Sequence, residues 1–154
     1  MCGRFVIDSP IGRLAIHTRE GKVMQVDYGV RSAVTNVLTD PLHKKIKRQL
    51  QAYFTNPSTA FTLPLELQGT PFQQKVWQAL QKIPVSQTLS YGELANRLHT
   101  SARAIGNACR ANPIPLLVPC HRVIAKNSIG GFSGATSGSD IDRKRWLLRH
   151  EGAL

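Results

Sequence analysis

The sequence feature that most constrains the fold is an apolar stretch broken by three prolines, residues 112–123, which reads Asn-Pro-Ile-Pro-Leu-Leu-Val-Pro-Cys-His-Arg-Val. The last of these prolines, Pro119, fixes its own φ angle and favours an extended backbone at Val118. The backbone at the next residue, Cys120, is therefore expected to be held in a restricted conformation. We predict that this segment serves to present the Cys120 thiol.

Cys120 is followed directly by His121 and Arg122. A thiol attacks as its thiolate, and a free thiol with a pKa of about 8.5 is mostly protonated at neutral pH. A nearby cation or proton acceptor favours the thiolate, and His121 is the nearest such acceptor. Most intracellular cysteines are buried and structural, but the Pro-Cys-His-Arg context favours a nucleophile. The sequence alone does not select the acid that would orient His121, and the candidates are Glu93, Asp140, Asp142 and Glu151.

The first part of the chain is predicted to form a small antiparallel sheet and one helix. Three segments have the composition of strands separated by short turns: 4–8, 13–18 and 22–28. Thr39 or Asp40 is predicted to cap a helix that begins at Pro41. The residues that follow this helix are predicted to be a connector with one short extended piece, 61–65. We therefore predict an N-terminal α/β domain over 1–65.

The second part, 66–154, is predicted to be a mainly helical domain, which makes the whole chain an α+β (α/β) protein. Capping boxes at Thr70 and Ser90 mark the starts of two helices. The second of these helices, 91–98, is followed by a turn and a helix over 101–111, which together form a helix-turn-helix. A final helix is predicted to begin after Ser139, with an inner side formed by Ile141, Trp146, Leu147 and Leu148.

The composition favours a polyanionic partner. The formal net charge is +11, with +5 carried by residues 1–64 and +6 by residues 96–154. Such an excess favours binding to nucleic acid, although charge alone does not establish it. The helix 101–111 adds a more specific signal, because its many small residues permit close approach to another surface while Arg103 and Arg110 supply positive charge.

Other sequence features exclude several classes of protein. The chain has three cysteines without CxxC spacing, which argues against a disulfide framework and a Cys-rich zinc site and fits a reducing compartment. No apolar run is long enough for a transmembrane helix, and the N-terminus lacks the apolar region of a signal peptide. We expect no membrane association, no metal and no cofactor, and a cytoplasmic protein near the nucleoid, or a nuclear one in a eukaryote.

The motif at 112–123 resembles the active-site motif of the O6-alkylguanine-DNA alkyltransferases, and the resemblance extends over roughly Thr70 to Gly152. It implies that Cys120 takes the alkyl group from O6 of guanine, or from O4 of thymine, in double-stranded DNA. The resulting thioether is not readily hydrolysed, so each molecule would react once. The resemblance also implies that His121 acts through a water, that Glu151 orients His121, and that Asn112 holds this network together.

The same resemblance implies how the DNA is engaged. The target base would be flipped out of the duplex, Tyr91 would donate a proton to it, and Arg103 would fill the vacated space. The helix 101–111 would enter the minor groove. The implied DNA contacts are Ala102, Arg103, Ala104, Gly106, Arg110 and Arg122, and the implied lesion pocket is formed by Tyr91, Val123, Phe132 and Ser133.

The match has departures, and other functions stay open. Phe132 stands where many members of the family have tyrosine, and the turn between Tyr91 and Arg103 is about two residues shorter than usual. We expect a monomer that is able to bind DNA cooperatively. The alternatives are a non-catalytic lesion sensor or helix-turn-helix regulator with an inert cysteine, and a thiol hydrolase.

Overall fold

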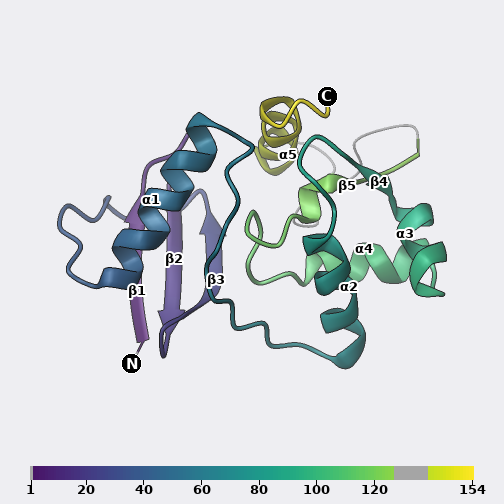
Figure 1. Ribbon diagram of the computed structural model, residues 1–154, viewed down its shortest axis with the longest axis horizontal. Coiled ribbons are helices and arrows are strands. Elements are labelled where there is room, and N and C mark those ends of the chain that lie inside the picture. The colour runs from purple at the N-terminus through teal and green to yellow at the C-terminus, as the bar shows by residue number, and fades with distance from the viewer. Residues whose placement is uncertain (1, 127–138) are drawn as a thin grey trace. The chain divides into compact units, whose positions relative to one another are not determined.

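The computed structural model describes residues 2–126 and 139–154 of the chain. The chain forms two compact units, Met1–Leu67 and Gln68–Leu154. The first holds a three-stranded antiparallel sheet with one helix and the second is mainly helical, so the predicted α+β class is confirmed (Figure 1). The division into domains at 1–65 and 66–154 stays a prediction, because compactness alone does not show that either part folds by itself.

The sheet of the first unit is an antiparallel meander in the order β1-β2-β3, as predicted. Its strands are β1 (Cys2–Ile7), β2 (Leu14–Arg19) and β3 (Lys22–Tyr28). Phe5 pairs with Ile16, and Ile16 pairs with Val26, so a row of buried apolar side chains crosses all three strands. Of the extended piece predicted at 61–65, only Leu65 joins the sheet, in an isolated parallel bridge to Val23.

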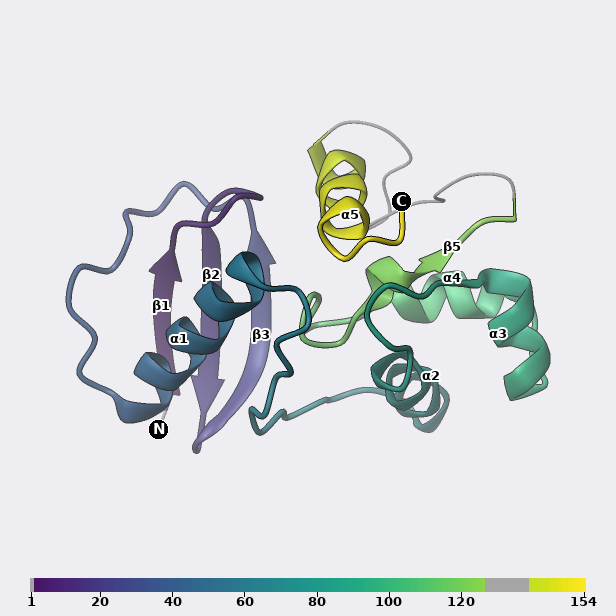
Figure 2. The ribbon, with the colours of Figure 1, turned by 45° about the horizontal axis from the view of Figure 1, so that its top comes forward.

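Helix α1 (Pro41–Thr55) lies across one face of this sheet (Figures 1 and 2). Asp40 caps the helix, since its side chain accepts a hydrogen bond from the backbone N–H of Leu42 at 2.8 Å. Ile46, Leu50 and Tyr53, which recur at helical spacing, are fully buried. The helix approaches β1 so closely that a Cβ atom at Gly3 would lie 2.8 Å from the His43 ring. Glycine at that position is therefore a packing requirement.

Two capping boxes start helices in the second unit where the sequence predicts them. Thr70 and Gln73 cap α2 (Pro71–Gln81), and Ser90 and Glu93 cap α3 (Tyr91–Leu98), each pair through two reciprocal hydrogen bonds. Helix α4 (Ala102–Arg110) follows a turn, and α3, this turn and α4 form the predicted helix-turn-helix. The buried Trp77 of α2 donates a hydrogen bond from Nε1 to the carbonyl of Ala108, 2.9 Å away, and so joins α2 to α4.

The last helix, α5 (Ser139–His150), buries a different side chain from the one predicted. Trp146 is only half-buried and stacks on His150, whereas Lys144 is fully buried. The inner face follows a spacing of three and four residues through Ile141, Lys144 and Leu148, which leaves Trp146 at its border. Within the described residues, none of the helices has both the length and the apolar content that a membrane span requires.

Candidate active site

The proline-rich stretch folds into a loop that Asn112 holds together. Its Nδ2 donates a hydrogen bond to the carbonyl of Val118 at 2.9 Å, and its Oδ1 accepts one from a backbone N–H inside the loop at 3.0 Å. At Pro119 φ is −81° and ψ is 68°, and the N–H of Cys120 donates to the carbonyl of Val118 at 2.8 Å. This geometry is an inverse γ-turn. It places Cys120 at the first position of a short 3-10 helix, η1 (Cys120–Arg122).

The carboxylate of Glu151 binds two consecutive residues of η1, His121 and Arg122. Glu151 Oε2 is 2.8 Å from His121 Nε2. Arg122 donates from Nε to Oε1 at 2.8 Å and from Nη2 to Oε2 at 3.1 Å, and its third nitrogen, Nη1, donates to the carbonyl of Ile83 at 2.6 Å. Since the side chains of His121 and Glu151 are fully buried, the three side chains form a network shielded from solvent. Of the four acids that the sequence leaves open, Glu151 is the one that contacts His121.

The contact with Glu151 determines which nitrogen of His121 carries the proton. A carboxylate oxygen only accepts hydrogen bonds, so the proton of the imidazole resides on Nε2. Burial lowers the pKa of His121, and the hydrogen bond to Glu151 opposes this effect without cancelling it. The imidazole is therefore neutral at neutral pH. Its Nδ1 is buried, has no hydrogen-bond partner among the described residues, and is the nitrogen that can accept a proton.

Cys120 is a buried residue, 7% exposed, and burial raises the pKa of its thiol. The side chain of Asn112, by a hydrogen bond, and the positive charge of Lys144 both oppose this rise. Arg122 was expected to favour the thiolate through its position in sequence, but it directs its three guanidinium nitrogens to Glu151 and to the carbonyl of Ile83. His121 binds Glu151 through Nε2 only, which leaves Nδ1 able to accept the thiol proton. Cys120 rests as a thiol, so its reaction requires a base that removes the proton.

Lys144 is a site residue that the sequence reasoning missed. Its ammonium donates a hydrogen bond to the carbonyl of Val123 at 2.7 Å and lies 5.7 Å from the centre of the Tyr91 ring. Burial lowers the pKa of Lys144 to about 8, while a charge on Cys120 would oppose this effect. In the sequence Lys144 belongs to a basic run that the dipole of the last helix explains by itself. Only its spacing from Ile141 and Leu148 marks it as an inward-facing position.

A short parallel ladder joins the helix-turn-helix to the cysteine motif. Strand β4 (Leu89–Ser90) pairs with β5 (Val123–Ile124), and Tyr91 begins α3 directly after β4. Tyr91 is half-buried, and Lys144 lies near both Tyr91 and Val123. Val123 is fully buried, and its carbonyl already accepts the hydrogen bond from Lys144.

Helix α4 presents a positively charged face with little bulk. Arg103 and Arg110 are exposed, stand two turns apart on one side of the helix, and form no hydrogen bond or ion pair with another described residue. A Cβ atom at Gly106, between them, would meet nothing within 4 Å. Because packing within the protein does not require a small residue there, the small size favours approach by something outside. Ala102 is also exposed, and Ala104 borders a hollow of about 260 Å³ between α4 and the start of α2.

The structure therefore brings together most, but not all, of the residues that the sequence singles out. The structure brings four of them together: Asn112, Cys120, His121 and Glu151. Tyr91 lies near Lys144, which in turn acts on Cys120. Arg122, predicted to contact DNA, uses all three guanidinium nitrogens on Glu151 and Ile83, so its contacts are those of a positioning residue. Phe132 and Ser133 lie outside the described residues.

The described residues include no group of three or more histidine, cysteine and acidic side chains that could hold a metal ion. The chemistry described above uses a thiol, an imidazole, a carboxylate and an ammonium, all supplied by the chain.

Comparison with known proteins gives one consistent result. The family described as 6-O-methylguanine DNA methyltransferase matches the chain through its ribonuclease-like domain at residues 4–67 and its DNA binding domain at residues 71–153. The chain is 39% identical to the constitutive methylated-DNA–protein-cysteine methyltransferase of Bacillus subtilis, over 94% of this chain and 92% of that protein. A probable methylated-DNA–protein-cysteine methyltransferase of Acanthamoeba polyphaga mimivirus is 40% identical, over 95% of this chain and 94% of that one.

Solved structures agree with this result. The crystal structure of the Mycobacterium tuberculosis O6-methylguanine methyltransferase matches with a TM-score of 0.83 and 38% identity, over 99% of this chain and 94% of that chain. A crystal structure of the M. tuberculosis OGT in complex with DNA matches with a TM-score of 0.80 and 39% identity, over 96% and 91% of the two chains. The chain therefore belongs to the 6-O-methylguanine DNA methyltransferase family.

Proposed function

We propose that this protein repairs DNA by moving the alkyl group from O6 of guanine, and from O4 of thymine, to the sulfur of Cys120. The observation that carries the proposal is the neutral His121, which Glu151 fixes in the tautomer whose Nδ1 accepts a proton, beside a cysteine that rests as a thiol. Names of the relatives support the same reaction: several are methylated-DNA–protein-cysteine methyltransferases.

The proposed reaction is a direct displacement at a saturated carbon. A bridging water carries the thiol proton to His121 Nδ1 as the sulfur attacks the alkyl carbon. The new S–C bond forms, the C–O6 bond breaks, and its electron pair passes to the guanine oxygen and ring. Tyr91 donates a proton to the departing base, and the Lys144 ammonium stabilises the negative charge on the sulfur before the new bond is complete. Because a thioether does not hydrolyse, each molecule acts once.

The alkylated base lies inside a duplex, so we propose that it is flipped out to reach the sulfur. A homologue has been solved in complex with DNA, and the charged, low-bulk face of α4 is suited to close contact with a duplex. Entry of α4 into the minor groove would allow backbone and shape contacts in place of sequence reading, with Arg103 in the space that the base leaves.

We propose that the protein acts as a monomer. It would act where the DNA is held, in the cytoplasm or, in a eukaryote, in the nucleus.

The proposal is tested by mass spectrometry after incubation with a duplex that contains one O6-methylguanine. We expect intact protein to gain the mass of one methyl group, on the peptide that contains Cys120, and no protein to gain a second. Saturation at one methyl group per molecule separates this reaction from a thiol hydrolase, which would turn over. It also separates the protein from a lesion sensor, which would bind the duplex and gain no mass. Methyl transfer to Cys109 would contradict the site assignment.

Truncation of Arg103 is expected to slow repair without unfolding the protein. Arg103 is exposed and forms no hydrogen bond or ion pair with another described residue, so Arg103→Ala should leave stability within about 0.5 kcal/mol. If Arg103 fills the space that the flipped base leaves, it offsets part of the energy needed to unstack that base. The methyl-transfer rate of Arg103→Ala should therefore fall by roughly a hundredfold or more. The measurement is single-turnover transfer with protein in excess. Arg31→Ala is the matched control, since Arg31 is an exposed arginine in the other unit, and an equal loss in both variants would contradict the assignment.

Replacement of Lys144 with methionine is expected to change how stability depends on pH. The folded-state pKa of Lys144 is about 8, against 10.5 for the free side chain. Since the folded state holds the Lys144 proton less tightly, the wild-type protein should gain stability relative to Lys144→Met as pH rises from about 8 to about 10.5, by on the order of 3 kcal/mol. Urea unfolding of both proteins across this range gives the difference.

The same variant should react more slowly at Cys120, because the ammonium favours the thiolate. Alkylation of Cys120 by iodoacetamide, followed by mass spectrometry, should shift to higher pH in Lys144→Met. Identical pH profiles in the two proteins would show that Lys144 does not act on the sulfur.

A further inference from the structure

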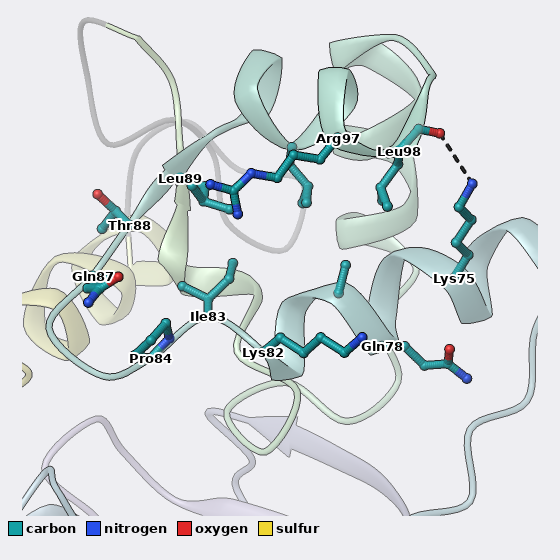
Figure 3. Close-up of a pocket in the computed structure, with 12 residues that line it drawn as sticks. Lys75, Gln78, Lys82, Ile83, Pro84, Gln87, Thr88, Leu89, Arg97 and Leu98 are labelled. Carbon is teal, nitrogen blue, oxygen red and sulfur yellow. Dashed lines mark hydrogen bonds between the residues drawn. The ribbon is translucent and has the colours of Figure 1, made fainter.

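A second cavity lies in the C-terminal unit, between α2, α3 and the segment that joins α2 to β4 (Figure 3). It measures about 420 Å³, which is within the range of cavities that bind small ligands or side chains of a partner. Neither Cys120 nor any residue of the Glu151 network lines it. Its apolar lining is formed by Ala79, Ile83, Pro84, Leu89, Leu94 and Leu98.

All the ionisable residues that line this cavity are cations. They are Lys75 on α2, Lys82 directly after α2 and Arg97 on α3 (Figure 3). Lys75 donates to the carbonyl of Leu98 at 3.3 Å, whereas the side chains of Lys82 and Arg97 form no hydrogen bond or ion pair with another described residue. No acidic side chain lines the cavity to balance the three charges. Gln78, Gln87 and Thr88 complete the lining. The cavity thus combines apolar and uncharged polar side chains with three cations that attract anions.

Hydrogen bonds to the rest of the unit hold the segment after α2, which forms one wall of the cavity. Arg122 Nη1 donates to the carbonyl of Ile83 at 2.6 Å, and Ser86 Oγ donates to the backbone carbonyl of Glu151 at 2.7 Å. A further hydrogen bond, from Gln87 N to the carbonyl of Pro84, closes a turn that follows Ile83 and contains Ser86. Because these bonds fix the segment before the turn and within it, the cavity is formed before any ligand arrives, which reduces the ordering cost of binding.

The cavity and the hollow beside α4 have no lining residue in common. Residues 75, 78 and 79 of α2 line the cavity and share one helix face. The hollow is lined by Phe72 and Gln73, at the start of the helix. A ligand in the cavity and a molecule in the hollow would therefore contact different residues of α2.

We infer that this cavity binds a short acidic segment of a partner protein, whose apolar side chains enter the cavity and whose carboxylates meet Lys75, Lys82 and Arg97. A nucleic-acid backbone would be attracted by the three cations, but it has no aliphatic side chains with which to fill an apolar interior. An acidic segment with interspersed leucines complements both the charge and the interior. This inference goes beyond the proposed function, because alkyl transfer to Cys120 does not require it.

The test is fluorescence anisotropy with a labelled peptide in which single leucines separate pairs of aspartates. We expect saturable binding to the wild-type protein. Binding should weaken by roughly tenfold or more when the aspartates are replaced by asparagine or the leucines by serine, because each change removes one half of the complementarity. Arg97→Glu and Lys82→Glu should each weaken binding by at least roughly tenfold, with folding checked by thermal unfolding. Arg31→Glu, the same charge reversal on an exposed arginine of the other unit, should leave binding nearly unchanged.

Three outcomes would overturn the inference. The first is no saturable binding of the acidic leucine peptide. The second is an equal effect of Arg31→Glu and Arg97→Glu, which would attribute binding to overall charge alone. The third is an equal loss of duplex binding and peptide binding in Arg97→Glu, which would assign the cavity to the DNA interface. Methyl transfer to Cys120 is measured separately, so failure of the proposed function and failure of this inference remain distinguishable.

Discussion

Replacement of Cys120 with alanine is expected to abolish methyl transfer completely while duplex binding is retained. In the proposed reaction the sulfur of Cys120 is the acceptor, and the neighbouring thiol of Cys109 is held protonated because burial raises its pKa to about 12. The substitution removes one atom from a buried position, so we expect a loss of stability of about 1 kcal/mol. Mass spectrometry after incubation with an O6-methylguanine duplex should show unmodified protein, and gel-shift titration should show wild-type affinity for the duplex.

Cys109→Ala is the matched control for this experiment. Cys109 lies on α4, and burial raises the pKa of its thiol to about 12, so it is protonated at neutral pH. It has neither the histidine nor the carboxylate that accompanies Cys120. The Cys109→Ala protein should therefore still gain one methyl group on the Cys120 peptide. A methyl group on Cys109 in the Cys120→Ala protein would indicate that the site accepts alkyl groups at either sulfur.

Glu151→Gln is expected to slow transfer by at least roughly a hundredfold, the lower limit for loss of general acid–base catalysis. The amide of glutamine can donate to His121 Nε2, which favours the other tautomer and places the proton on Nδ1, where it blocks acceptance from the thiol. The substitution also leaves the Arg122 guanidinium without its buried counter-charge. We therefore expect a loss of stability of about 3 kcal/mol. Single-turnover transfer and urea unfolding measure the two effects.

Glu66→Gln is the control for charge loss alone. Glu66 pairs with Arg19 at 3.0 Å in the other unit, and both side chains are partly exposed. Solvent screens such a pair, so its neutralisation should cost little stability and should leave the transfer rate unchanged. If Glu151→Gln folds and transfers at the wild-type rate, the proposed route of the proton through His121 is wrong.

The sequence predicts the elements of this fold well because their boundaries are encoded locally. Thr70 with Gln73 and Ser90 with Glu93 each satisfy backbone donors within one turn, so the start of a helix is visible in four consecutive residues. The same holds for the turn at Pro119, where proline itself fixes φ. Such signals require no knowledge of what packs against the element.

The electrostatics of the site depend on packing and were predicted less well. The sequence places His121 and Arg122 next to Cys120, but the chain turns both towards Glu151, some thirty residues away. The effect of Lys144 on Cys120 arises because α5 packs its inner face against the cysteine motif. Burial, which raises the pKa of Cys120 and lowers that of Lys144, is a property of the whole unit and cannot be read from neighbouring residues.

The two-residue ladder between β4 and β5 has a consequence for which atoms can react. It joins Ser90, where α3 begins, to Ile124, just beyond the cysteine motif, so backbone pairing connects the helix-turn-helix directly to the segment that carries the sulfur. In the proposed complex, the position of the duplex on the helix-turn-helix would then determine how far each atom of the target base lies from the sulfur. An alkyl group would then react according to its distance from the sulfur. The identity of the base that carries the alkyl group would matter only because it sets that distance.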